Sequence, residues 1–294
     1  MSAVSIQVTP LHPVFACAIT GVDLSKPIDA ATRDAIAKAM DQYAVAVLPA
    51  QKMSDRQHVD FSALYGRLET SPHFGVKDGA KVRMSLPELF DVSNLDENNE
   101  ILVEDDRRRF YRLANEMWHT DSSFQPGGAK YSLLYAKVVP SKGADTEFAD
   151  MRAAYDDLPA AKKASIEGLV VEHSTYHSRS LIGYQFTEEE LKRRTATRQY
   201  LVQRHPSSGR KALYLASHAS HIVGWPEEKG RALLAELTAH ATQRKYVYAH
   251  QWRVGDLLIW DNRCTMHRAT PFPDFAEKRD LQRTTVVGDL PVVA

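Results

Sequence analysis

Cysteine is scarce in this sequence, which contains only Cys17 and Cys264 among 294 residues. Two cysteines are too few for the disulfide framework of a small secreted protein, and no apolar run approaches the roughly 20 residues that span a membrane. The first residues also lack the basic region and apolar stretch of a secretory signal. We therefore expect a cytoplasmic protein without membrane contact.

The sequence also lacks an excess of charge of either sign. Lys and Arg total 37 and Asp and Glu total 37, so the formal net charge is zero. Proteins that bind nucleic acid or membrane surfaces concentrate positive charge, and the composition gives no sign of this. We expect no nucleic acid partner, and chemistry on a small molecule becomes the leading hypothesis.

Alternation and turn residues predict many short strands, together with a smaller number of helices. The predicted strands cover residues 4–10, 15–22, 44–50, 90–95, 131–139, 169–174, 200–205, 211–216, 246–252, 257–260 and 282–288. The predicted helices cover residues 29–44, 54–68, 151–158, 160–169, 187–194 and 226–241. This pattern favours one mixed α/β domain over residues 1–294 that is mainly β, with a sandwich or jelly-roll barrel and helices packed outside.

One segment, residues 70–117, fits this pattern poorly, because it is polar, charged and weakly periodic. A connection of this length is typical of a lid or an insertion around an active site. A solvated surface insertion is the alternative. We expect the segment to cover the site, with one strand at residues 90–95.

The segment MWHTDSSF, residues 117–124, contains a candidate metal-binding pair. His119 and Asp121 lie two positions apart, and side chains at that spacing in an extended chain face the same side. A second pair, His58 and Asp60, has the same spacing but lies in a predicted helix, where residues two apart point to nearly opposite sides. We therefore interpret only the first pair as half of a metal site.

A third ligand must come from elsewhere in the chain. The candidates are His205, His218, His221, His250 and His267. His173 and His177 lack the glutamate of a zinc-protease helix, so we interpret them as structural or pocket-lining. His267 follows a turn, a buried strand and a short connection, which suits a histidine held at the mouth of a barrel. Spacing favours His267 without deciding the question.

Two histidines and one carboxylate on one face of an ion leave the opposite face open, as in non-haem Fe(II) oxygenases. The same ligands could bind zinc for hydrolysis. An oxygenase that uses 2-oxoglutarate must also hold its distal carboxylate, and a planar arginine does so with hydrogen bonds worth roughly 1.5–3 kcal/mol each. Arg279 and Arg283, four positions apart, are candidates, and an ordinary surface pair is the alternative.

Several spaced motifs together carry a resemblance to a known family. They are WHTDSSF, GADTEFADMRAAYDDLP, SGRKALYL, SHASHIVG, WDNRCTMHRATPF and KRDLQRTTVVGD. In order from about Thr9 to Asp289, the chain resembles the taurine dioxygenase and dichlorophenoxyacetate dioxygenase (TauD/TfdA) family. It is more similar to the herbicide-degrading branch than to the taurine branch.

This resemblance implies a double-stranded β-helix that binds Fe(II) through His119, Asp121 and His267. It implies that Arg279 pairs with the distal carboxylate of 2-oxoglutarate and that Thr146 hydrogen-bonds the same group. O2 would be the third reactant. Family members commonly form homo-oligomers, so we expect a homo-oligomer here as well.

The resemblance also implies where substrate binds. Arg283 matches a family arginine near the anionic group of the substrate, and Asn94 matches a position close to the substrate in the taurine branch. Trp260 and Phe148 should form apolar walls. Residues 203–205 depart from the family pattern, because Arg204 is displaced by one position, which on a strand moves it to the other face. Whether Arg204, His205 or His218 contacts substrate therefore stays open.

These implications give one leading hypothesis about function. The protein would hydroxylate an aryloxyalkanoate at the carbon next to the ether oxygen, giving a phenol, a 2-oxo acid, succinate and CO2. A sulfonate or another small anion is the nearest alternative substrate. A zinc hydrolase and a non-catalytic metal-binding protein are alternatives from other classes.

Overall fold

The computed structural model describes residues 6–71, 83–106, 108–192 and 196–293. Its strands are β1 (Gln7–Pro10), β2 (Cys17–Thr20), β3 (Val45–Leu48), β4 (Phe90–Ser93), β5 (Ala129–Val138), β6 (Thr146–Asp150), β7 (Val170–Ser174), β8 (Ala196–Tyr200), β9 (Val202–Arg204), β10 (Lys211–Leu213), β11 (Ala219–Ile222), β12 (Val247–His250), β13 (Leu257–Asp261), β14 (Thr265–Ala269) and β15 (Asp280–Val287). Its helices are α1 (Ala30–Tyr43), α2 (Asp55–Ala63), α3 (Arg108–Ala114), α4 (Met151–Asp156), α5 (Ala160–Ile166), α6 (Thr175–Ser180), α7 (Glu188–Lys192) and α8 (Glu227–Ala241), with a 3-10 turn at Arg244–Tyr246.

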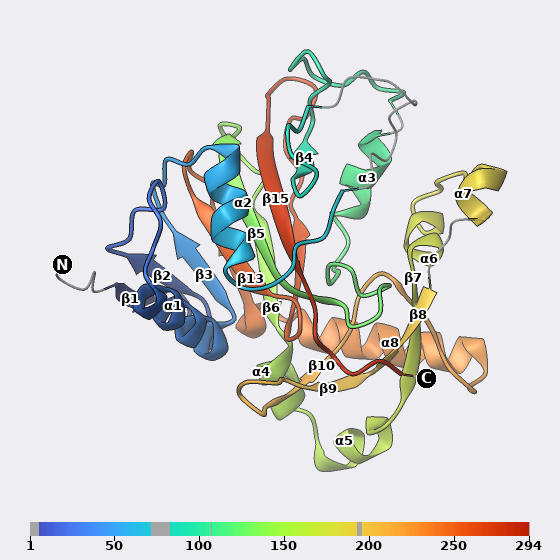
Figure 1. Cartoon of the computed structure of the whole chain (residues 1–294). Coiled ribbons are helices and arrows are strands. Elements are labelled where there is room, and N and C mark those ends of the chain that lie inside the picture. Colours follow the sequence, from blue (N-terminus) through green and yellow to red (C-terminus); the bar gives the residue numbers. More distant parts are fainter. Residues whose placement is uncertain (1–5, 72–82, 107, 193–195, 294) are drawn as a thin grey trace.

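A seven-stranded sheet forms the larger layer of the molecule, in the order β1-β2-β3-β13-β5-β15-β4 (Figure 1). Its pairs are antiparallel except for β2 with β3. A second antiparallel sheet has the order β12-β6-β14, and an isolated bridge between His119 and His267 adds the predicted metal-binding segment to its edge. The chain is therefore mixed α/β and mainly sheet, as the sequence predicts.

Alternation along the strands divides the side chains of the larger sheet between two cores. On β13, Leu257 and Ile259 pack in the core with residues of α1 and α2, whereas Leu258 and Trp260 pack in a core with Phe148 of the second sheet. Strands β3 and β5 alternate in the same way. The larger sheet thus has helices on one face and the second sheet on the other, which explains its nearly continuous apolar strands.

The same alternation turns several polar side chains into the space between the two sheets. Ser132 lies two positions before Leu134 of the inner core, and Arg283 lies two positions after Leu281 of that core. On the second sheet, Thr146 lies two positions before inward-facing Phe148. Polar groups from both sheets therefore meet in one interior.

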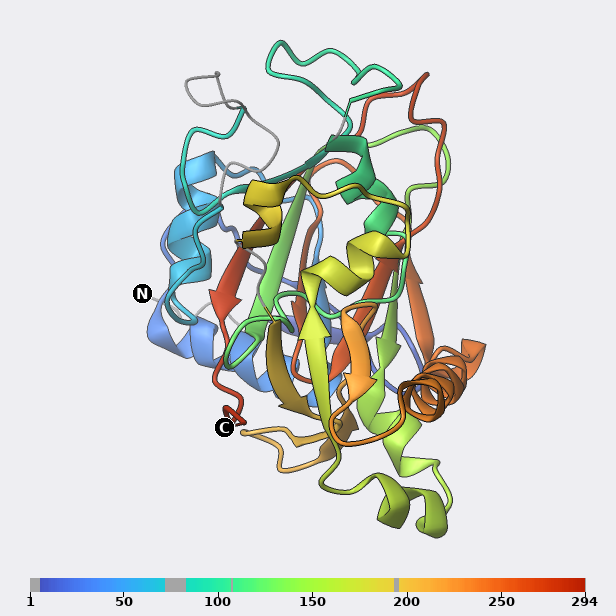
Figure 2. The ribbon, with the colours of Figure 1, turned by 90° about the vertical axis from the view of Figure 1, so that its right-hand side faces the viewer.

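Another core lies on the outer side of the second sheet. It joins α4 and α8 to β6, β7, β10 and β11. In Figure 2, α8 is the orange helix seen nearly end-on beside these strands. None of the helices in the described part of the chain combines the length and apolar character that a membrane crossing requires.

The starts of the predicted helices with clear capping residues are confirmed, although α2 ends at Ala63 rather than at residue 68. Asp29 accepts a hydrogen bond from the Thr32 backbone at the start of α1, and Ser54 and Gln57 form a capping box at the start of α2. His58 is fully buried, while Asp60 is exposed and paired with Arg56. The second His-x-Asp pair is therefore divided between core and surface, as predicted.

Other predictions were wrong or incomplete. The segment predicted to contain only one strand also contains α3, and β4 pairs with β15 as an edge strand of the larger sheet. Residues 72–82 and 107 of the predicted lid lie outside the described residues. The strand predicted at residues 200–205 is divided between β8 and β9. His267 follows β13 and the short connection at residues 262–264, as predicted, but it lies in the middle of β14, a strand that was not predicted.

Candidate metal and substrate site

The backbone brings the first and third predicted ligands together. His119 and His267 exchange two hydrogen bonds, with N···O distances of 3.0 and 2.8 Å, and their ring centroids lie 4.1 Å apart. His119 Nε2 lies 3.9 Å from Asp121 Oδ1, and His267 Nε2 lies 3.7 Å from Asp121 Oδ2. One potential ligand atom from each residue therefore fits within 4.8 Å of the others.

The imidazoles have the form that a metal requires. His119 Nδ1 lies 2.8 Å from the Met117 carbonyl oxygen, which can only accept, so Nδ1 carries the hydrogen and Nε2 offers its lone pair. His267 Nδ1 is buried and has no hydrogen-bond partner in the described part of the chain. Burial is the main cause that lowers the pKa of both His119 and His267, so both rings are neutral.

Asp121 supplies the negative charge of the site. Burial alone would raise its pKa, but the Arg283 guanidinium and the hydrogen bond from Ser132 act in the opposite direction, and the pKa is held well below its usual range. Arg283 Nη1 donates a hydrogen bond to Oδ1, and Ser132 Oγ donates to Oδ2 at 2.8 Å. The carboxylate is therefore ionised and fixed in orientation.

Two aromatic side chains pack against His267. The ring of Trp260 lies 4.7 Å from that of His267, and the Phe148 ring is stacked on His267 at 6.0 Å between centroids. Trp260 is 1% exposed and Phe148 is fully buried. Both side chains therefore lie beside His267, and their role as apolar walls of the site stays a prediction.

The residues expected around 2-oxoglutarate are buried in the same part of the fold. Thr146 faces inward on β6, where its hydroxyl accepts a hydrogen bond from Trp252 Nε1 at 3.0 Å. Arg279 is 7% exposed, and its Nη1 donates to the Val92 carbonyl oxygen at 3.2 Å. Both side chains are therefore buried polar groups, and their binding of the distal carboxylate of 2-oxoglutarate stays a prediction.

The side chain of Asn94 is buried and hydrogen-bonded to the loop that precedes β15. Its side-chain amide donates to the carbonyl oxygens of Asp274 and Glu277, and its Oδ1 accepts from the Arg279 backbone at 2.8 Å. These bonds hold the loop that carries Arg279. Both polar atoms of the Asn94 side chain are thus occupied, which favours an indirect effect on substrate through that loop over a direct contact.

Four residues around Asp121 were missed in the sequence. Ser132 and Asn262 form a hydrogen-bonded chain to Asp121, and Ser122 Oγ donates to Glu69 Oε2 at 2.9 Å. Burial raises the pKa of Glu69, while Ser122 and Arg283 oppose that shift. Ser132 was detectable only as a small polar residue inside a predicted apolar strand, and Asn262 only as part of the WDNR motif.

The other candidate histidines lie in different surroundings. His218 is buried beside the site, 6.4 Å between ring centroids from His119, and its Nδ1 lies 2.8 Å from Ser178 Oγ. His250 bonds to Asp256, and His221 lies beside Ser220. Of the candidates for a third ligand, His267 alone joins the group that contains His119 and Asp121 in the described part of the chain.

The departure from the family pattern at residues 203–205 is also resolved. Arg204 is exposed and donates to the Gly209 carbonyl oxygen within the hairpin. His205 is fully buried, with Nε2 2.9 Å from Asp261 Oδ2 and Nδ1 facing Ser208. Neither side chain faces the group formed by His119, Asp121 and His267.

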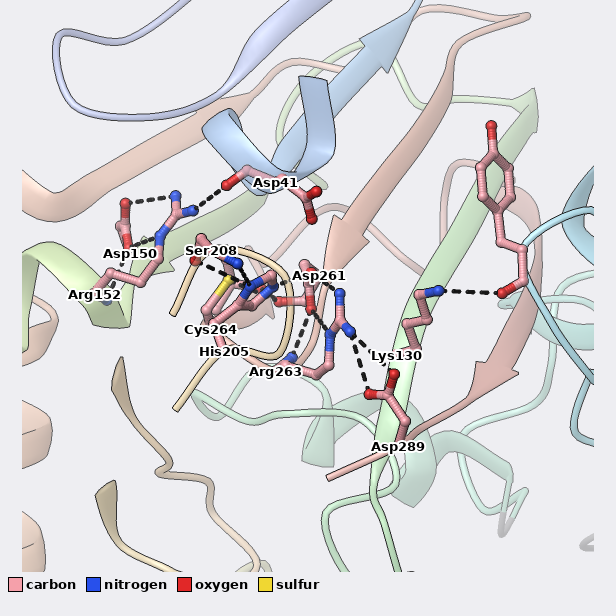
Figure 3. Close-up of polar contacts among 12 residues, drawn as sticks. Asp41, Lys130, Asp150, Arg152, His205, Ser208, Asp261, Arg263, Cys264 and Asp289 are labelled. Atoms are coloured by element: carbon pink, nitrogen blue, oxygen red, sulfur yellow. Dashed lines mark hydrogen bonds and ion pairs between the residues drawn. The ribbon is translucent and has the colours of Figure 1, made fainter. Parts of the chain in front are cut away.

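His205, Asp261 and Cys264 form the second group with metal-ligating atoms close together among the described residues. Figure 3 shows why this group is structural. Arg263 donates to both oxygens of Asp261, through Nε at 2.9 Å and Nη2 at 2.7 Å, while His205 occupies the same carboxylate. Burial raises the pKa of Cys264, which keeps it a thiol. An ion would have to displace these partners.

Comparison with known proteins agrees with this geometry. The family model described as "Taurine catabolism dioxygenase TauD, TfdA family" matches residues 7–285. The alpha-ketoglutarate-dependent 2,4-dichlorophenoxyacetate dioxygenase of Cupriavidus pinatubonensis is 41% identical over 286 residues, covering 97% of this chain and 99% of that protein. The (S)-phenoxypropionate/alpha-ketoglutarate-dioxygenase of Sphingobium herbicidovorans is 34% identical, covering 97% of this chain and 96% of that protein.

A solved structure gives the same result. The crystal structure of AAD-2 in complex with Mn(II) and N-oxalylglycine superposes with a TM-score of 0.90 at 42% identity, covering 99% of each chain. The fold, the grouped ligands and the match over most of the sequence lead to one conclusion: the chain belongs to the TauD/TfdA family of dioxygenases.

Proposed function

We propose that this protein is an Fe(II)- and 2-oxoglutarate-dependent dioxygenase that hydroxylates an aryloxyalkanoate at the carbon next to the ether oxygen. The observation that carries the proposal is the buried group of His119, Asp121 and His267, with Arg283 beside it. The relatives named for dichlorophenoxyacetate and phenoxypropionate support the substrate class. Their names also contain alpha-ketoglutarate, which is 2-oxoglutarate, and this supports the cosubstrate.

The site fits Fe(II) on its own chemistry. Two neutral imidazoles and one ionised carboxylate are the ligand set of non-haem Fe(II) oxygenases, and they leave positions open for other ligands. The strand order β4-β15-β5-β13 facing β12-β6-β14 supports a double-stranded β-helix. In that fold the ligands would come from facing positions of paired segments, as the bridge between His119 and His267 suggests.

Bound Fe(II) with 2-oxoglutarate would supply the oxidation, in which O2 places one oxygen atom in succinate and one in the substrate as CO2 is lost. Arg279 would hold the distal carboxylate of 2-oxoglutarate through its guanidinium fork, with Thr146 donating a second hydrogen bond. Arg283 would hold the carboxylate of the substrate, since it is a cation that lies beside Asp121. Phe148 and Trp260 would exclude water from the reacting carbon.

The product of this hydroxylation carries a hydroxyl group and an aryl ether on one carbon. Such a hemiacetal breaks its bond to the aryl oxygen as the hydroxyl proton is lost, giving a 2-oxo acid and a phenol after protonation. The protein needs only to orient the substrate so that this carbon faces the metal. The carboxylate contact with Arg283 would set that orientation.

The remaining expectations are part of the same proposal. We propose one catalytic domain over residues 1–294, with the segment at residues 70–117 covering the site and a homo-oligomer in solution. We also propose a cytoplasmic location, where Fe(II) stays reduced and the buried free Cys17 and Cys264 stay thiols.

Succinate formation from 2-oxoglutarate by the Fe(II)-loaded protein tests the function. A panel would contain aryloxyacetates, aryloxypropionates and alkyl sulfonates. We expect aryloxyalkanoates to stimulate succinate formation and to release a phenol. Stimulation by sulfonates with sulfite release would keep the reaction and replace the substrate. No succinate with Fe(II), together with hydrolysis in the Zn(II) form, would refute the proposal.

A further inference from the structure

Asn262 lies in the turn between β13 and β14 and contacts the predicted metal ligand Asp121 both directly, at its backbone, and through Ser132. Its Oδ1 lies 3.2 Å from the Asp121 backbone nitrogen and 3.0 Å from Trp260 Nε1. Its Nδ2 lies 2.9 Å from Ser132 Oγ. Asn262 and Ser132 are both fully buried, so water cannot replace these partners.

The chemistry of the partners fixes the direction of every hydrogen bond in this chain. An indole N–H and a backbone N–H can only donate, so the atom of Asn262 that faces them must be the amide oxygen. The amide nitrogen then faces Ser132 and donates to its hydroxyl oxygen. The single hydroxyl hydrogen of Ser132 is therefore free to point at Asp121 Oδ2, which lies 2.8 Å away.

Because Ser132 accepts from Asn262, its own hydroxyl hydrogen is donated to one oxygen of Asp121. We infer that Asn262 is a positioning residue that acts through Ser132 to hold Asp121 as a one-oxygen metal ligand. The inference rests on the proposed metal site. Arg283 donates to the other oxygen of Asp121, so without Ser132 the carboxylate would be held at one oxygen only. It could then turn to bind an ion through both oxygens and fill a position that the 2-oxo acid needs.

Two substitutions test the chain at different points. Ser132→Ala removes the hydrogen bond to Asp121. Asn262→Asp keeps the size of the side chain and can still accept from Trp260, but it cannot donate to Ser132, whose hydrogen would then turn towards residue 262. Ser62→Ala is the matched control, because Ser62 is also fully buried and hydrogen-bonded, to His58 and Thr284, on the other face of β15.

Co(II) binding to the full chain, followed by calorimetry and visible absorption, is the readout. We expect Ser132→Ala and Asn262→Asp to weaken Co(II) binding by roughly 10- to 100-fold, the usual effect of removing a partner of a metal ligand. We also expect both to change the Co(II) absorption bands, which report coordination number. Ser62→Ala should keep the affinity and spectrum of the unsubstituted protein.

Wild-type Co(II) affinity and spectrum in both variants would overturn the inference. An equal loss in Ser62→Ala would overturn it as well, because general loosening of the core would then explain the effect. A failure of the unsubstituted protein to bind Co(II) would instead refute the proposed metal site. The two failures are therefore distinguishable.

Discussion

Replacing Arg283 with lysine separates charge from geometry at the proposed substrate anchor. The Arg283 side chain is 18% exposed, and its Nη1 donates to Asp121. Its Nε is buried and lacks a hydrogen-bond partner among the described residues. The guanidinium thus has donors left for a second anion, and lysine would keep the positive charge but lose the planar fork.

The size of the effect follows from the hydrogen bonds lost. A charge-assisted hydrogen bond in a mostly buried site contributes about 1.5–3 kcal/mol. Losing one of the two bonds of a fork should therefore raise the KM for the aryloxyalkanoate by roughly 10- to 150-fold. The KM for 2-oxoglutarate should change far less, since Arg279 is the residue proposed to hold that molecule.

Succinate formation with either reactant varied measures both KM values. Arg279→Lys is the matched control, and it should reverse the pattern by raising the KM for 2-oxoglutarate. If Arg283→Lys leaves the KM for the aryloxyalkanoate unchanged while weakening metal binding, Arg283 is only the partner of Asp121. That result would refute the assignment of Arg283 to substrate.

Three further predictions concern other parts of the molecule. Thr146→Val should raise the KM for 2-oxoglutarate by roughly tenfold, because one hydrogen bond to a carboxylate is lost; an unchanged KM would exclude Thr146 from that site. Arg263→Met should lower the free energy of unfolding in urea by about 3–5 kcal/mol, because it leaves buried Asp261 without its cation. Arg56→Met, at an exposed ion pair, should leave the unfolding midpoint unchanged. Equal losses of unfolding free energy in the two variants would contradict the predicted difference between a buried and an exposed ion pair. Burial lowers the pKa of His58 to about 4 from 6.5, so the unfolded chain binds more protons between those pH values, and stability should fall by about 3 kcal/mol as the pH drops through them. His58→Gln should flatten the dependence of the unfolding free energy on pH, measured by urea unfolding at a series of pH values. An equally steep dependence in this variant would refute its assignment to His58.

Local patterns predicted the parts of the fold that depend on nearby residues. Asp29 and Ser54 mark their helices because a cap is formed within three residues of the helix start. The apolar strands β3, β5 and β13 were recognisable because both faces are buried. By contrast, β6 and β14 contain charged residues such as Glu147 and Arg268, which pair with each other across the strands. Their strand character comes from pairing that local alternation does not reveal.

The site shows the same division between local and distant information. His119 and Asp121 could be predicted from their spacing, and family resemblance selected His267 among several histidines. Asn262 could not be assigned a role, because its contact with Asp121 joins residues 141 positions apart in the chain. Sheet register decides such contacts, and one position of slip on a strand would turn Ser132 away from the site.

The most direct test of the proposed function is the amount of phenol and succinate formed from one aryloxyacetate by the Fe(II)-loaded protein. The proposed function predicts equal amounts of the two products, a requirement for both O2 and 2-oxoglutarate, and loss of both products in Asp121→Ala. Phenol release that continues without 2-oxoglutarate, or in Asp121→Ala, would contradict it.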